Sequence, residues 1–207
     1  HDGSISLHSH YDRPVVAAIT FRTKPDADPG RSCVSWLSPG ANELTISPGA
    51  TAQFSVSVRI PNKTADGEYH ADAVVLTDGE DAGATGVHIP VHVRVGEVYS
   101  DVKLANVGAE RMEQEVVFRF HLTQLGNAAY RGNLALRLEN GSGREVHAQN
   151  RTVDIYGKGT VELTLPSSQI PKGRYRVFMN FNSDRTDLGT QALPVLPKKY
   201  TIDINMP

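Results

Sequence analysis

The sequence predicts an all-β protein built from two tandem immunoglobulin-like β-sandwich domains, and three observations carry this prediction. Apolar residues recur at every second position over most of the chain, which is the period of a strand with one buried face. Gly, Pro, Asn and Asp interrupt the alternation about every 8 to 12 residues, a spacing typical of β-sandwiches. The two halves of the chain also share one order of turns and strands.

The first half contains six segments that alternate in this way. They are rich in Val, Ile, Thr and Phe, which favour strands, and Gly, Pro or Asn residues separate them. We expect strands at residues 5–10, 15–22, 43–47, 52–60, 67–76 and 86–95.

The second half follows the same rule with seven segments. Only residues 111–115, RMEQE, suggest a helix, and this stretch is too short to matter. We expect strands at residues 101–106, 115–123, 131–139, 151–155, 159–165, 173–181 and 199–204.

An internal repeat links the two halves. Each half has a turn glycine, an alternating strand, a proline, a short connection, and then Gly-x-Tyr opening the next strand. Proline ends the ladder, glycine permits a tight turn, and the tyrosine ring can enter the core while its hydroxyl bonds nearby backbone. This arrangement is similar to the tyrosine corner of immunoglobulin-like sandwiches. The matching positions are Pro61, Gly67 and Tyr69 in the first half, and Pro166, Gly173 and Tyr175 in the second.

Length and charge agree with two globular domains. The 207 residues can bury two cores, and we place the domains at residues 1–97 and 98–207. The mean hydropathy is −0.32, and no apolar run reaches the roughly 18 to 20 residues of a membrane span, so membrane insertion is not expected. Residues 1–97 carry a net charge of −5 and residues 98–207 one of +3. Neither half has the basic and aromatic motifs of a nucleic-acid-binding protein.

Catalytic motifs are not apparent, so we expect neither an enzyme nor a cofactor. The chain has no Gly-x-Ser-x-Gly elbow, and residues 140–144, NGSGR, fit a turn between strands. The single cysteine, Cys33, excludes an internal disulfide and is expected to be a buried thiol beside Trp36. The acidic residues at 78–81 and 184–187 fit no complete calcium loop and are expected to lie in solvated loops.

The histidines offer two pairs that share a strand face. His8 and His10 would lie about 7 Å apart along a strand, close enough to chelate a metal ion. His88 and His92 would lie about 13 Å apart, which is too far for a single ion. A pair of histidines alone does not make a metal site, and we assign none to either pair.

The most regular apolar stripe of the chain lies at residues 87–95, VHIPVHVRV. Pro90 stands between its apolar positions, and because proline cannot donate a ladder hydrogen bond, this strand belongs at a sheet edge. Two interpretations stay open: the last strand of an ordinary sandwich with its apolar face inward, or a strand offered to another polypeptide by β-augmentation. The candidate protein-binding positions are Val87, Ile89, Val91, Val93 and Val95.

Two stretches of the first half, residues 32–61 and 66–75, resemble the first domain of the periplasmic chaperones of chaperone-usher pili, with a Pro-Gly before one strand and Gly-x-Tyr after it. The resemblance implies that residues 87–95 occupy the place of the donor strand, which completes a pilin subunit without nucleotide. It also implies a basic pair that anchors the subunit's terminal carboxylate, for which Arg94 and Arg13 are the candidates.

Residues 126–146 and 170–177 also resemble, more weakly, two-domain bacterial surface accessory proteins of the WxL-associated type, which bind peptidoglycan or a partner protein. Such an adhesion or cell-wall-binding module would make contact through the loops at 78–83 and 182–189. A third alternative is a copper-binding sandwich, since an N-terminal histidine such as His1 can bind copper through its amine and its ring.

The leading hypothesis is a non-enzymatic, exported protein that holds a pilin-like or surface-protein subunit by strand addition. The composition, rich in Ser, Thr, Val and Asn, favours export to the periplasm or cell surface of a bacterium.

Overall fold

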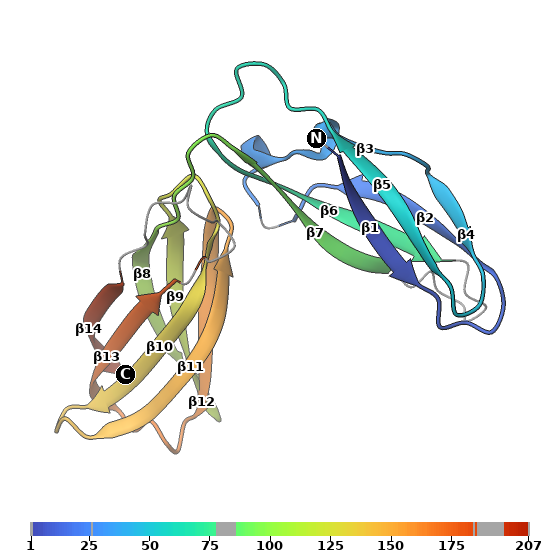
Figure 1. Ribbon diagram of the computed structural model, residues 1–207. Coiled ribbons are helices and arrows are strands. Elements are labelled where there is room, and N and C mark those ends of the chain that lie inside the picture. The colour runs from blue at the N-terminus through green and yellow to red at the C-terminus, as the bar shows by residue number, and fades with distance from the viewer. Residues whose placement is uncertain (1, 26, 78–85, 184, 186–196, 207) are drawn as a thin grey trace. The chain divides into compact units, whose positions relative to one another are not determined.

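The computed structural model describes residues 2–25, 27–77, 86–183, 185 and 197–206, and these are almost entirely strands and turns. The chain divides into two compact units, His1–Val95 (unit 1) and Gly96–Pro207 (unit 2), each of which pairs one three-stranded with one four-stranded sheet (Figure 1). The predicted all-β class with two sandwiches is confirmed. Within the described ranges, no helix has the length and apolarity needed to cross a bilayer.

Unit 1 is a sandwich of two antiparallel sheets. The first has the order β1-β5-β3, formed by β1 (Asp2–His8), β5 (Thr51–Val58) and β3 (Leu37–Pro39). The second has the order β4-β2-β6-β7, formed by β4 (Glu43–Ile46), β2 (Val15–Arg22), β6 (Gly67–Thr77) and β7 (Gly86–Val95). Two short 3₁₀ turns, η1 (Pro29–Arg31) and η2 (Val34–Trp36), connect β2 to β3.

The core of unit 1 contains the single thiol. Cys33 is fully buried and packs in one cluster with Trp36 and Tyr69, as the sequence predicted for a structural cysteine. Burial raises the pKa of the Cys33 thiol to about 11, so the group is protonated at neutral pH. The rings of Trp36 and Tyr69 lie 4.4 Å apart. This cluster therefore serves packing, because only the thiolate form of a cysteine is a nucleophile.

Unit 2 repeats the two-layer plan with longer strands. One sheet has the order β12-β9-β8, formed by β12 (Lys158–Pro166), β9 (Glu115–Gln124) and β8 (Val102–Arg111). The other has the order β11-β10-β13-β14, formed by β11 (Glu145–Ile155), β10 (Tyr130–Asn140), β13 (Gly173–Asn182) and β14 (Lys198–Met206).

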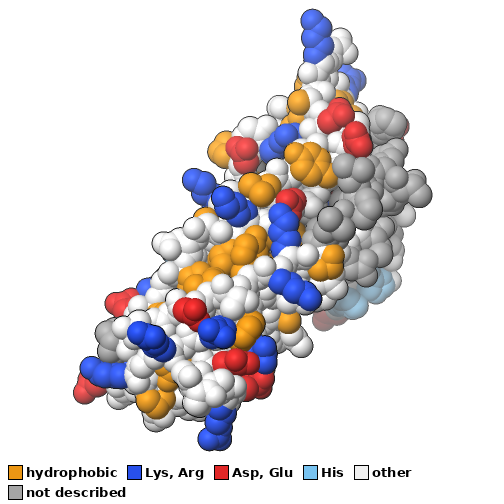
Figure 2. Space-filling model, turned by 90° about the vertical axis from the view of Figure 1, so that its left-hand side faces the viewer, with side chains coloured by type: hydrophobic (Ala, Val, Ile, Leu, Met, Phe, Trp, Pro, Cys, Tyr) orange, Lys and Arg blue, Asp and Glu red, His pale blue; other side chains and the backbone are white. Residues whose placement is uncertain are grey.

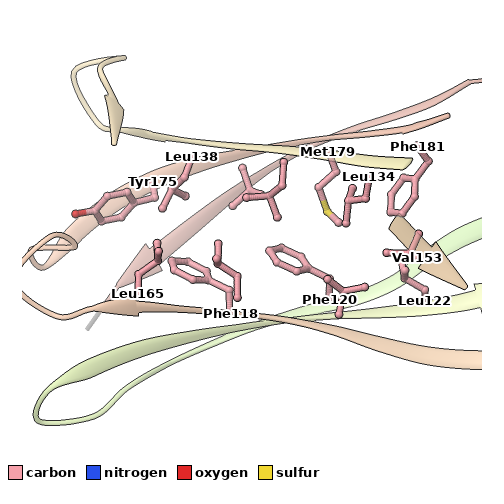
Figure 3. Packing of buried hydrophobic residues seen from close by; sticks show 14 of the residues in the cluster. Phe118, Phe120, Leu122, Leu134, Leu138, Val153, Leu165, Tyr175, Met179 and Phe181 are labelled. Carbon is pink, nitrogen blue, oxygen red and sulfur yellow. The ribbon is translucent and has the colours of Figure 1, made fainter. Parts of the chain in front are cut away.

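One hydrophobic cluster fills the space between these two sheets. Phe118 and Phe120 on β9 point toward Leu138 and Met179 of the opposite sheet, and all four side chains are at most 2% exposed (Figure 3). The alternation of buried and exposed residues on β12 and β13 supplies the remaining inward side chains. Unit 2 thus has a continuous core of its own.

The internal repeat forms the same local structure in both units. Tyr69 donates a hydrogen bond from its hydroxyl to the carbonyl of Ala65 at 2.9 Å, and Tyr175 donates one to the carbonyl of Pro171 at 2.7 Å. Both rings are buried, and the glycine two residues before each tyrosine has φ of +144°. Only glycine adopts this backbone conformation without strain. The predicted tyrosine corner is therefore present twice.

We expect that replacing Tyr175 with Phe lowers the free energy of unfolding by about 1 kcal/mol, because the variant keeps the buried ring but leaves the Pro171 carbonyl without its hydrogen bond. Tyr69→Phe should cost a similar amount through the carbonyl of Ala65. Urea denaturation followed by circular dichroism measures both effects. Tyr11, which is 41% exposed, supplies the control, and losses no greater than that of Tyr11→Phe would contradict the prediction.

The segment that follows Gly96 is fastened to unit 2 by hydrogen bonds. Asn127 accepts from the backbone N–H of Tyr99 at 2.8 Å and donates to the carbonyl of Glu97 at 2.9 Å. The backbone N–H of Ala128 donates to the carbonyl of Tyr99, and that of Leu125 to the carbonyl of Asp101, both at 3.0 Å. The entry into unit 2 is thus held from its first residues.

Candidate functional site

Strand β7 lies at the edge of its sheet. It pairs with β6 in an unbroken antiparallel register from Gly67↔Val95 to Leu76↔Gly86. Among the described residues β6 is its only strand partner, and Figure 1 shows β7 along the margin of unit 1. Pro90 lies within this strand opposite Asp72, in agreement with the preference of proline for edges.

The apolar face of β7 changes from open to buried along its length. Val87 is 52% exposed, whereas Val93 is only 9% exposed and belongs to the cluster around Trp36. Between them, Ile89 and Val91 are partly buried and pack against the core of unit 1. The first half of the stripe is therefore the part that another chain can reach.

The backbone of β7 turns one set of polar groups outward. The carbonyl of His70 accepts from the N–H of Cys33 at 3.1 Å, so the backbone groups of His70 point away from β7. His70 and His92 consequently form a pair without ladder hydrogen bonds. Pairs without ladder hydrogen bonds recur at every second residue of β7. The backbone N–H and C=O groups at these positions therefore point away from β6, to the outer side of the strand, and the positions are His88, Pro90, His92 and Arg94. The missing N–H of Pro90 falls on that side.

The other face of β6 and β7 carries buried charge. Glu68 is fully buried, and its Oε1 lies 3.4 Å from Nη2 of Arg94 and 3.2 Å from Nδ1 of His92. His70 is 4% exposed, and its Nδ1 lies 3.1 Å from that of His92. A buried carboxylate requires such partners, because its desolvation is otherwise costly.

The structure does not bring the two candidate anchor residues together. Arg94 lies opposite Glu68, where β6 begins and β7 ends. Arg13 precedes β2 at the other end of the sheet, because Ala17 already pairs with Thr77, the last residue of β6. A single carboxylate therefore cannot contact both guanidinium groups.

Of the histidine pair His8 and His10, His1 and the predicted acidic positions, the structure describes only the pair. The rings of His8 and His10 lie 4.8 Å apart, and Nδ1 of His8 is bonded to the hydroxyl of Thr51 at 3.1 Å. His1, residues 78–81 and residues 184 and 187 lie outside the described residues. Glu68 and His70 were not predicted from the sequence. Their signal is the alternation in GEYHAD, which places both on one face of β6, where they lie opposite Arg94 and His92.

Unit 2 has an open groove lined by residues of β10, β11, β13 and β14. Its lining includes Arg137, whose guanidinium lies 4.2 Å from the ring centre of Phe178, as well as Lys199 and Tyr200. Figure 2, which shows one face of the molecule, has a strip of hydrophobic side chains among lysines, arginines and acidic residues. A group of buried and partly buried polar side chains within hydrogen-bonding distance of one another lies on β6 and β7 of unit 1.

Over the residues that the structure describes, the fold is that of a protein of two β-sandwich units with a long edge strand in the first. No known family model matches the chain, and no curated protein does.

Solved structures similar to the chain include pilus chaperones, and each similarity spans both units. They include the CupB2 chaperone of Pseudomonas aeruginosa, with 11% identity over 99% of this chain and 92% of that one and a TM-score of 0.45. The E. coli chaperone DraB has 10% identity over 98% and 89%, with a TM-score of 0.45. The CsuC–CsuE chaperone–tip adhesion subunit pre-assembly complex of Acinetobacter baumannii gives 12% identity over 98% and 90%, with a TM-score of 0.49. At these identities and TM-scores the similarity has no bearing on function.

Proposed function

We propose that the chain is a non-enzymatic assembly factor that holds an extended segment of another polypeptide as an additional strand on the outer side of β7. The client would be a pilin-like or surface-protein subunit, and the complex would form after export, in the periplasm or at the cell surface of a bacterium. The single observation that carries the proposal is the position of β7, a ten-residue strand at the edge of its sheet.

Strand addition needs main-chain groups that point outward and side-chain contacts that set the register. Both are available on β7. The backbone of His88 is directed to the outer side, and Val87 on the adjacent apolar face is 52% exposed. An added strand could continue the ladder and cover the exposed half of Val87 and the accessible part of Ile89, which favours binding by a fraction of the about 1.5 to 3 kcal/mol that full burial of a Val or Ile side chain contributes.

The proposed binding mode does not include the basic pair that the resemblance implied as an anchor for the client's terminal carboxylate. Because Arg13 and Arg94 lie at opposite ends of the sheet, no terminal carboxylate bridges them. Arg94 is in addition an ion-pair partner of Glu68. Affinity is instead attributed to the backbone and to the apolar face.

A panel of fluorescein-labelled nine-residue peptides, in which apolar residues of different size alternate with threonine, tests this proposal by fluorescence anisotropy. We expect at least one peptide to bind. Val87→Asp should weaken it at least about 100-fold, because the added strand would cover an unpaired charge. His88→Asp is the matched control, since His88 is exposed on the opposite face of the same strand, and should have little effect.

A second pair of variants tests the backbone itself. His88→Pro removes an N–H that points outward and leaves the ladder with β6 intact, so we expect affinity to fall about 5-fold to 10-fold. His88→Ala removes the same side chain but keeps the N–H, and should bind normally. Failure of every peptide in the panel, or equal losses for His88→Pro and His88→Ala, would overturn strand addition on β7.

A further inference from the structure

A compact group of metal-ligating side chains lies on the polar face of β6 and β7. Glu68, His70 and His92 each place one ligand atom within 4.8 Å of the others. The Nδ1 atoms of His70 and His92 are 3.1 Å apart, and Nδ1 of His92 lies 3.2 Å from Oε1 of Glu68. Glu68 and His70 are buried, and the side chain of His92 is 14% exposed. The three side chains are therefore close together and largely buried, and His92 is the most exposed of them.

The strand register explains why these atoms converge. His70 and His92 face each other in a pair without ladder hydrogen bonds, as the bond from Cys33 to the carbonyl of His70 shows. In such pairs the Cα atoms are only about 4.5 Å apart and the side chains are at their closest. Glu68 lies two residues before His70 and so projects from the same face of β6. Three donors from two strands thus lie within 4.8 Å of one another.

Nδ1 of His92 lies between the two other groups, 3.2 Å from Oε1 of Glu68 and 3.1 Å from Nδ1 of His70. One hydrogen on this atom can serve either contact. A divalent cation would instead accept a lone pair from each of the three atoms at once. In a tetrahedral zinc site, with Zn–N distances of about 2.0 to 2.1 Å, neighbouring ligand atoms lie about 3.3 Å apart. The separations of His92 Nδ1 from His70 Nδ1 and from Glu68 Oε1 are close to this value, and the third pair, His70 and Glu68, lies within 4.8 Å and would draw together on the ion.

We propose that Glu68, His70 and His92 bind one Zn²⁺ ion, through the carboxylate and the two Nδ1 atoms, with a fourth position for water. Imidazole nitrogens together with a carboxylate suit zinc better than calcium or magnesium, which prefer oxygen ligands. The guanidinium of Arg94, 3.4 Å from Oε1 of Glu68, would orient the carboxylate as an outer-shell partner. The ion would join the edge strand β7 to β6, and it does not depend on the proposed strand addition.

Isothermal titration of the chelator-treated full chain with Zn²⁺ tests the site. We expect one ion per chain, and at least about a 100-fold loss of affinity in His92→Gln and in His70→Gln. His88→Gln is the matched control, because His88 lies on the same face of β7, four residues from His92 and outside the group. His8→Gln controls for the ring pair of His8 and His10. Both controls should bind as the parent protein does.

Two further measurements keep the result independent of folding. Co²⁺ substituted for zinc should give the absorption of a tetrahedral site in the parent protein and in His88→Gln, and lose it in His92→Gln. Zinc should raise the melting temperature of the parent protein and not that of His92→Gln. The proposal is overturned if the parent protein binds no zinc, if a folded His92→Gln binds it unchanged, or if His8→Gln abolishes binding. None of these outcomes affects peptide binding to the outer side of β7.

Discussion

Replacing Phe118 with Ala should lower the free energy of unfolding of unit 2 by about 3 to 5 kcal/mol. Phe118 is fully buried on β9 and points into the space between the two sheets of unit 2 (Figure 3). Its removal takes apolar surface out of the core and leaves a cavity, because the strands on either side, paired through Ala109 and Leu163, cannot close over it. This loss is a large fraction of the stability of a domain of this size.

The two units allow the effect of Phe118→Ala to be located. Trp36, the only tryptophan of the chain, lies in the core of unit 1, so its fluorescence reports on that unit. Because the units have separate hydrophobic clusters, we expect Phe118→Ala to lower the urea midpoint of unfolding measured by circular dichroism. The urea midpoint measured by Trp36 fluorescence should stay unchanged. Phe178→Ala is the control: Phe178 is partly exposed on an outer face, beside Arg137, and should cost about 1 kcal/mol. Equal losses for both variants would contradict the prediction.

Replacing Gly126 with Ala should destabilise unit 2 by about 3 kcal/mol, the upper part of the range for overpacking. A Cβ atom at this position would lie 2.3 Å from the carbonyl oxygen of Tyr99 and 2.9 Å from the backbone nitrogen of Asp101. These are backbone atoms of the segment that is hydrogen-bonded to residues 125–129, so they cannot move aside without loss of those bonds.

Gly108 provides the matched control for Gly126→Ala. It lies in β8 of the same unit, and a Cβ atom built there meets nothing within 4 Å. Gly108→Ala should leave the stability of unit 2 unchanged or raise it by about 0.5 kcal/mol, because alanine restricts the unfolded chain. Thermal denaturation of both variants measures the difference. A Gly126→Ala protein as stable as Gly108→Ala would show that the segment after Gly96 is not held as described.

Alternation and turn chemistry predicted most of the fold from local sequence. The tyrosine corners were predictable because the proline, the glycine and the tyrosine act over a few residues, and each turn can form without knowledge of the rest of the chain. Strand β7 was predictable for the same reason, since Pro90 and the valine stripe together specify an edge.

Where tertiary contacts decide, the sequence predicted less. The first half of β11, residues 145–150, has only Val146 and Ala148 as apolar residues and lies at a sheet edge, so pairing with β10 forms this part of the strand. The three-residue strand β3 likewise exists through its pairing with β5. The first expected strand, residues 5–10, lies instead at Asp2–His8, where its partner β5 fixes the register.

The cluster on β6 and β7 was beyond reach from sequence for a related reason. Glu68 and His70 are 22 to 26 residues away from their partners His92 and Arg94 along the chain, and only the register of the two strands brings them together. A register shifted by one residue would place them on opposite faces. The separation of His88 and His92 along one strand gave no indication that the partner of His92 lies on the neighbouring strand.

Pro90 has a consequence for the behaviour of the protein in concentrated solution. An exposed edge strand is a template on which identical chains can stack into fibrils. Any strand that runs along the outer side of β7 meets one position that offers a carbonyl and no N–H, and a second copy of β7 would bring the same gap with it. We therefore expect polymerisation through this edge to be disfavoured, while a single foreign segment with a different sequence can still be accommodated.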